Sequence, residues 1–226
     1  MRRNLKTSFI LNCIIVVLFL FGMISSLTSF RWMGTEGNLT PETHNFLWFF
    51  TVDSNILLAA ASLVLLTYEA LILFGKSKVI PHWVIVLKYV AVTATTLTLL
   101  TVILYLSPLL GLEFWKLFLN TNLIYHLISP ILGIVSLIIF EADEKLEWKV
   151  SFLALIPMGL YGIFYVINVY THLDNGKVNP KYDFYYFASQ GIFITILVLI
   201  GMILLTFGEA YLVYYLREKR RRKLSV

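Results

Sequence analysis

The sequence predicts an all-α, polytopic membrane protein built as a bundle of six transmembrane helices. Of its 226 residues, 59% are hydrophobic and only 14% are charged, whereas soluble domains are about 45–50% apolar and about 25% charged. The mean hydropathy of +0.81 agrees with this composition. Six apolar runs approach or exceed the length of about 20 residues that an α-helix needs to cross the hydrocarbon core of a bilayer.

The six runs account for nearly the whole chain. The expected spans are 8–30, 46–74, 81–110, 115–140, 152–170 and 184–215. The loops between them are too short for a separate soluble domain, so residues 1–226 are expected to form one transmembrane domain. The first run follows basic residues, as a signal peptide would, but its apolar region is longer and no clear cleavage site follows it. We therefore interpret it as the first span.

Basic residues are distributed unequally between the two sides of the predicted bundle. Lys and Arg gather in the N-terminal segment, in the second and fourth loops and in the tail 216–226, whereas the opposite side carries only Arg31, Lys116, Lys177 and Lys181. By the positive-inside rule both termini are expected in the cytoplasm. The basic tail would contact anionic lipid head groups, and binding of nucleic acid is not expected.

The sequence contains no motif for a bound cofactor or metal. It has no phosphate-binding glycine loop and no cysteine-based metal motif, and its lone Cys13 cannot form an intramolecular disulfide. No cofactor and no metal site are therefore expected. Three charged residues lie near the predicted cytoplasmic ends of their spans, where their side chains are expected to reach the interface: Glu69, Lys88 and Glu209.

His126 is the most informative residue, because it lies eleven residues into the predicted fourth span. An ionisable side chain inside a membrane helix is rare and is by default a hypothesis for a functional site. Pro130 lacks the N–H that would bond to the His126 carbonyl, so we expect a kink and a cavity beside the imidazole.

Three spans contribute polar side chains to the same predicted outer half of the bundle. They are Thr51, Asp53 and Asn55 in the second span, Asn122 and Tyr125 beside His126 in the fourth, and Tyr165 and Asn168 in the fifth. Helical spacing puts Thr51 on one face with Asn55 and Asn122 on one face with His126, whereas Asp53 points elsewhere. On straight helices Thr51 would lie roughly 6 to 8 Å shallower than His126. Each hydroxyl or amide could instead serve only as hydrogen-bonding glue between helices.

Nucleophilic acyl transfer requires at least a nucleophile and a base, and a threonine hydroxyl beside an imidazole can supply both. His126 would take the proton of Thr51. Asn122 or Asn55 could hold the histidine tautomer or donate to an oxyanion. Asp53 could reach the imidazole from a neighbouring face. The tyrosines at 125 and 165 and the asparagine at 168 are expected to line the pocket.

These segments resemble a known family. They are FFTVDSN at the start of the second span, N-x-x-x-H followed closely by proline in the fourth, a fifth span bearing Tyr and His, and Gly208-Glu209 late in the sixth. They are similar to the androgen-induced protein and androgen-dependent TFPI-regulating protein (FAR-17a-like) family of six-span intramembrane threonine hydrolases. The resemblance implies hydrolysis of fatty acid esters of hydroxy fatty acids, with Thr51 as nucleophile and His126 as base.

The chain also departs from the animal proteins of that family. Pro130 follows the histidine by four residues, one fewer than in the animal proteins, and the loops differ in length and composition. The compact chain and the lack of eukaryotic targeting signals favour a bacterial relative in the plasma membrane. Its substrate need not be the animal one.

Two classes of function remain open on the sequence. The first is an intramembrane lipid-ester hydrolase that takes its substrate from the surrounding membrane lipids. The second is a non-catalytic small transporter, channel or lipid-sensing protein with a polar pocket in the outer leaflet. The internal symmetry and broken helices of inverted-repeat transporters are not evident. A purely structural role of the polar groups is the third interpretation.

Overall fold

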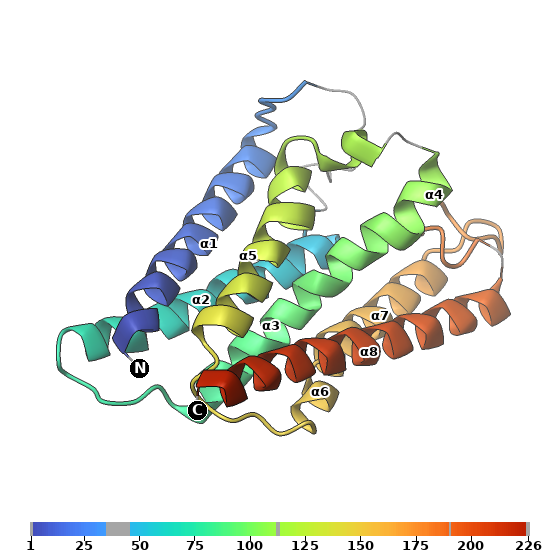
Figure 1. The fold of residues 1–226 in the computed structure, drawn as a ribbon. Coiled ribbons are helices and arrows are strands. Elements are labelled where there is room, and N and C mark those ends of the chain that lie inside the picture. Colours follow the sequence, from blue (N-terminus) through green and yellow to red (C-terminus); the bar gives the residue numbers. More distant parts are fainter. Residues whose placement is uncertain (1, 35–45, 112–113, 190, 225–226) are drawn as a thin grey trace.

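The structure, a computed structural model, describes residues 2–34, 46–111, 114–189 and 191–224. Within these ranges the chain is helical and forms no strand, and it has six helices long and apolar enough to span a membrane. They are α1 (Arg2–Thr28), α2 (Phe50–Leu73), α3 (His82–Thr101) with its continuation η2 (Val102–Leu106), the continuous η4 (Leu123–Ile128), α5 (Ser129–Val135) and η5 (Ser136–Phe140), α6 (Val150–Leu153) with α7 (Leu155–Thr171), and α8 (Ile192–Leu224). The predicted all-α bundle of six membrane helices is confirmed (Figure 1).

Both chain termini lie at the same end of the bundle, as Figure 1 shows. We call it the termini end, and the opposite end the distal end. The distal end carries the loops between α1 and α2, between α3 and η4, and between α7 and α8. Short helices lie in or beside these loops: η1 (Phe46–Trp48), α4 (Ser107–Leu110) and η3 (Phe114–Phe118).

Several span boundaries differ from the predicted ones, at the distal end in the fourth and sixth spans and at the termini end where α8 continues to Leu224 and not to residue 215. The fourth span begins at Leu123 and not at residue 115, because Asn120 has a left-handed backbone (φ 55°) that interrupts the helix. The sixth begins at Ile192, after Gly191 with φ 94°, so that the aromatic segment 184–187 lies in the loop. Hydropathy alone could not separate apolar residues that cover the end of the bundle from apolar residues that cross it.

Helix α3 is the most buried of the six spans and packs against α2, α5, α7 and α8. Its middle is rich in Ala and Thr, whose small size lets neighbouring helices approach closely. Thr93, Thr95 and Thr96 donate their hydroxyl protons to carbonyls three or four residues earlier in the same helix. These hydroxyls are therefore satisfied without any partner outside α3, and the helix can be buried on all sides.

The prediction that Glu69, Lys88 and Glu209 reach the interface is wrong, because all three are buried. Lys88 is fully enclosed, and its Nζ donates to Asn12 Oδ1 on α1 and to Ser62 Oγ on α2, each at 2.6 Å. Asn12 in turn donates to Glu141 Oε1 at 2.9 Å. Lys88 lies on a face of α3 that is covered by its neighbours, so its side chain cannot extend to the surface. Lys88 therefore links α3 to α1 and α2, and through Asn12 to the loop after η5.

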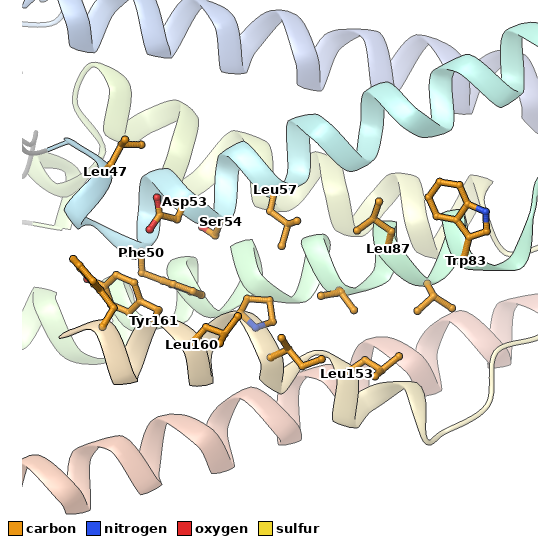
Figure 2. Close-up of a pocket in the computed structure, with 15 residues that line it drawn as sticks. Leu47, Phe50, Asp53, Ser54, Leu57, Trp83, Leu87, Leu153, Leu160 and Tyr161 are labelled. Atoms are coloured by element: carbon orange, nitrogen blue, oxygen red, sulfur yellow. The ribbon is translucent and has the colours of Figure 1, made fainter. Parts of the chain in front are cut away.

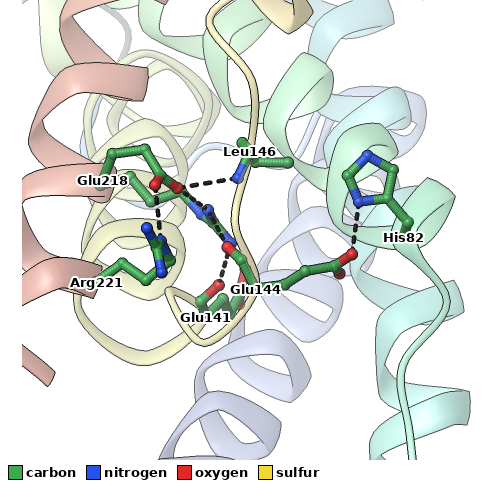
Figure 3. Close-up of polar contacts among 7 residues, drawn as sticks. His82, Glu141, Glu144, Leu146, Glu218 and Arg221 are labelled. Carbon is green, nitrogen blue, oxygen red and sulfur yellow. Dashed lines mark hydrogen bonds and ion pairs between the residues drawn. The ribbon is translucent and has the colours of Figure 1, made fainter. Parts of the chain in front are cut away.

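The basic tail is not a separate segment, because α8 continues through it as far as Leu224. Arg217 is fully buried and donates to the backbone carbonyls of Glu141 and Glu144, at 2.7 and 2.8 Å. Glu218 accepts from the Leu146 N–H at 3.0 Å and from Arg221 at 2.7 Å (Figure 3). The start of the tail therefore fixes the loop before α6. The last two residues of the predicted tail, 225 and 226, lie outside the described residues.

Replacing Lys88 with methionine is expected to destabilise the protein strongly. The change leaves Asn12 Oδ1 and Ser62 Oγ buried without their charged donor, and each hydrogen bond to a charged group contributes about 1.5–3 kcal/mol. Thermal unfolding of the purified protein in detergent should show a clearly lower midpoint for Lys88→Met. Lys78→Met, at an exposed position, is the matched control. Equal midpoints for the two variants would contradict a structural role of Lys88.

Candidate functional site

Thr51 and His126 are in contact at the distal end of the bundle. Thr51 Oγ1 lies 3.0 Å from His126 Nε2, a normal hydrogen-bond distance between a hydroxyl and an imidazole. His126 is buried, whereas Thr51 is partly exposed. The two residues that the sequence singled out as nucleophile and base therefore form a pair.

The contact depends on where the two spans begin. Thr51 is the second residue of α2, and His126 is the fourth residue of η4, so both lie within about one turn of the distal end. A fourth span that starts at residue 115 would put the imidazole deeper in the bundle, but η4 begins eight residues later, at Leu123. The expected difference in depth between Thr51 and His126 disappears with the corrected boundary.

Asn55 holds the two helices of the pair together. Its Nδ2 donates to the Thr51 carbonyl at 2.8 Å and to the Tyr125 carbonyl at 3.1 Å, which links α2 to η4 next to His126. Ser54 adds a second tie, because its hydroxyl contacts the Thr51 carbonyl at 3.1 Å and Thr98 Oγ1 on α3 at 3.0 Å. The amide N–H groups of Asn55 are thus used on backbone carbonyls, and Asn55 positions the pair without facing a substrate oxyanion.

The other side of the imidazole is almost free of polar contacts. Nδ1 of His126 makes no hydrogen bond of good geometry within the described part of the chain, although the Leu117 backbone interacts with the ring. With the proton on Nδ1, Nε2 is the ring nitrogen that accepts the Thr51 proton. Asn122 does not orient the ring: its Nδ2 is buried and also has no hydrogen-bond partner among the described residues.

Pro130 affects the helix differently from the expectation. The backbone adopts a π-helix over Leu123–Ile128, with wider turns than an α-helix, and then continues as α5. The π-helical segment carries His126. Neither of the two cavities described below is lined by residues of η4 or α5, and the cavity expected beside Pro130 stays a prediction.

Tyr185, in the loop before α8, is a third polar residue at the pair and was missed in the sequence. Its hydroxyl interacts with the hydroxyls of Thr51 and Tyr161. Burial raises the pKa of Tyr185 to about 12, although these two neighbouring hydroxyls oppose the increase. Tyr185 is therefore an un-ionised O–H donor next to Thr51 at neutral pH. No sequence motif indicates Tyr185 as a site residue, because only the folding of the loop against the bundle brings it next to α2.

Tyr165 fixes the loop that carries Tyr185. Its hydroxyl donates to the buried Asp183 Oδ1, which also accepts the Ala188 N–H at 3.1 Å. The rings of Tyr165, Tyr185 and Phe187 pack against one another and cover the distal end of the site. Tyr165 therefore affects the site indirectly, by holding the loop that places Tyr185 next to Thr51.

Two further predicted pocket residues lie away from the pair. Tyr125 points toward α1, where its hydroxyl approaches the Phe19 carbonyl at 3.4 Å and its ring fits against Gly22, at which a Cβ would come within 2.7 Å of the ring. The Nδ2 of Asn168 is buried without a hydrogen-bond partner among the described residues. The backbone carbonyl of Asn168 contacts His172 Nδ1 at 2.8 Å. Neither residue forms a described hydrogen bond with Thr51 or His126.

Two cavities lie near the pair on either side of an aromatic wall. A void of about 30 Å³ adjoins Thr51, Thr98 and Tyr185 and has room for about one water molecule. A groove of about 770 Å³ runs between α2, α3 and α6–α7 (Figure 2). Asp53 lines the groove, which agrees with a side chain that points away from Thr51. It forms no described hydrogen bond with His126, although a contact from a neighbouring face was expected to be possible.

Within the described ranges no group of three or more His, Cys, Asp or Glu side chains is placed to hold a metal ion. Comparison of the chain with protein-family models, with curated proteins and with solved structures found no match in any of the three.

Replacing Thr51 with valine is expected to remove the hydrogen bond at His126 Nε2 and keep the shape of the side chain. Solution or solid-state NMR of protein labelled with ¹⁵N-histidine should show the Nε2 resonance of His126 moving in Thr51→Val. Thr67→Val is the matched control, because Thr67 lies on the same helix and donates to its own Leu63 carbonyl at 3.0 Å. An unchanged Nε2 resonance in Thr51→Val would contradict the contact.

Proposed function

We propose that the protein is an intramembrane hydrolase of lipid esters that uses Thr51 as nucleophile and His126 as base. The observation that carries this proposal is the distance of 3.0 Å between Thr51 Oγ1 and His126 Nε2. A nucleophile and a base in hydrogen-bond contact are the geometric signature of covalent acyl transfer. The resemblance to the FAR-17a-like family supports the same pair and suggests fatty acid esters of hydroxy fatty acids as substrates.

In the proposed reaction His126 Nε2 takes the hydroxyl proton of Thr51 while Oγ1 attacks the ester carbonyl carbon. The bond between that carbon and the alkoxy oxygen then breaks, and the leaving alcohol takes the proton from Nε2. Water enters the acyl-enzyme, gives a proton to Nε2 and attacks the same carbon. Release of the fatty acid returns the proton to Oγ1, so that Thr51 and His126 end unchanged.

Tyr185 is proposed as the donor to the oxyanion that forms during each attack. Its hydroxyl interacts with Thr51, and with a pKa raised to about 12 it keeps its proton at neutral pH. A fixed donor in a site closed to bulk water stabilises developing negative charge far better than the same group in water. This role falls to Tyr185 because Asn55 is bound to two carbonyls.

We further propose that the termini lie in the cytoplasm, with the Thr51–His126 pair toward the outer leaflet. The excess of Lys and Arg on the side of the termini supports this orientation. The bacterial plasma membrane, and contact of the exposed part of the tail with anionic lipid, remain parts of the same proposal.

Thr51→Ala and His126→Ala are each expected to abolish ester hydrolysis while the protein stays folded. Hydrolysis of long-chain fatty acid esters by purified protein in lipid nanodiscs measures the effect, and a fluorophosphonate probe should label Thr51 in the unchanged protein. Thr67→Ala is the matched control on the same helix. Full activity of Thr51→Ala would disprove the mechanism, and a pH-dependent ion flux that survives this substitution would favour a transporter.

Tyr185→Phe is expected to lower kcat by about 10²- to 10³-fold, the usual cost of removing one oxyanion donor. The ratio of wild-type to variant kcat should stay constant from about pH 7 to about pH 10, because a pKa of about 12 keeps Tyr185 protonated throughout this range. The exposed neighbour Tyr186 provides the control Tyr186→Phe. A ratio of wild-type to Tyr185→Phe kcat close to one would show that the Tyr185 hydroxyl does not stabilise the oxyanion and that the residue serves only in packing.

A further inference from the structure

The groove beside α2 has the form of a binding site for a chain molecule. It extends from Leu153 to Phe164 along α6–α7, a rise of roughly 16 Å at about 1.5 Å per residue. Its volume of about 770 Å³ is within the range of about 300–1,000 Å³ found for single-ligand sites. Figure 2 shows Trp83 at one end of the groove and Phe50, Asp53 and Tyr161 at the other.

The polarity of the lining changes along the groove. Aliphatic side chains and Trp83 line the half toward the termini end, where no charged residue is present in the lining. Asp53 and Ser54 lie at the distal half, on the α2 turn that follows Thr51. Because the groove lies along membrane-spanning helices and opens sideways, the molecules that reach it are lipids.

Phe50 and Tyr161 separate the groove from the Thr51 void, because both residues line both cavities. Their rings are in contact, with centroids 5.2 Å apart. The Tyr161 hydroxyl donates to the Trp48 carbonyl at 2.7 Å, which holds the ring in this position. A lipid in the groove is therefore close to Thr51 and yet shielded from it by two aromatic side chains.

We infer that the groove binds one unbranched acyl chain of the lipid ester, methyl end toward Trp83, and that displacement of the Phe50–Tyr161 ring pair admits the ester carbonyl to Thr51. This inference rests on the proposed function and extends it to the class of substrate. The apolar half of the groove takes the chain, and the polar half faces the ester. The groove runs as one strip between α2, α3 and α6–α7, which matches an elongated, unbranched ligand.

The first test measures chain binding without requiring turnover. A long-chain fatty acid methyl ester with a diazirine at its methyl end is photolysed with the protein in nanodiscs, and labelled residues are mapped by mass spectrometry. Labels are expected at the Trp83 end of the groove, and excess unlabelled ester should reduce them at least tenfold. Bulk lipid contact at Leu204, exposed on α8, should not be reduced in this way. Labelling that is equal at the Trp83 end of the groove and at Leu204 on α8 overturns the inference, and so does labelling that the competitor does not reduce.

The second test measures chain selection by filling the groove. Leu160 lines it with 65% of its surface exposed, so Leu160→Trp adds bulk to the groove without changing the core. The ratio of turnover of 16-carbon to 4-carbon esters is expected to fall at least tenfold. Leu204→Trp, at a lipid-facing position with 66% exposure, is the matched control and should keep the wild-type ratio.

The two tests separate failure of the inference from failure of the proposed function. If the enzyme is active and depends on Thr51, but Leu160→Trp leaves the chain-length ratio unchanged, the inference that the groove binds the acyl chain is overturned. The proposed hydrolase function then still holds. Competed labelling at the Trp83 end in a protein that hydrolyses no ester supports chain binding and overturns the hydrolase.

Discussion

The position of α2 between its neighbours is the constraint on which the rest of the structure depends. Near the termini end, Ser62 accepts a hydrogen bond from Lys88 of α3. Near the distal end, Ser54 contacts Thr98 of α3, and Asn55 reaches the backbone at Tyr125. Because these ties are short and lie in the interior, where water does not compete for them, they fix both the rotation and the depth of α2. The place of the Thr51 hydroxyl follows from this rotation.

The buried polar groups of the bundle are not all hydrogen-bonded. At the termini end, the Lys88 ammonium and the Arg217 guanidinium are buried and hydrogen-bonded to side chains or carbonyls, so they stabilise the packing of helices and loop. At the distal end, Asn122 Nδ2 has no hydrogen-bond partner within the described ranges. The same is true elsewhere in the bundle of both carboxylate oxygens of Glu209. Unpaired buried polar groups cost stability, and in this structure they are not confined to the side of the Thr51–His126 pair.

The spans and the two residues of the Thr51–His126 contact could be predicted from the sequence. Apolar runs of about 20 residues define helices in a membrane, and an ionisable residue such as His126 is rare within such a run. Thr51 was indicated by its place in the same half of the bundle and by the family resemblance. The burial of Lys88 could not be predicted in this way, because the face of α3 that α1 and α2 cover is a matter of tertiary packing. Tyr185 was beyond reach for the same reason: 134 positions separate it from Thr51 in the chain.

The contact of the Thr51 hydroxyl with His126 depends on the place of Thr51 in its helix. Threonines inside helices bond back to a carbonyl of the preceding turn, which occupies the hydroxyl. Here Thr28, Thr67, Thr93, Thr95, Thr96, Thr98, Thr171 and Thr206 do so.

Thr51 differs because it is the second residue of α2, and the residue four positions earlier, Leu47, belongs to the separate turn η1. No preceding helical turn competes for its proton, so the hydroxyl is available to His126. The same threonine one turn deeper would donate to its own helix, and the imidazole would lose its partner.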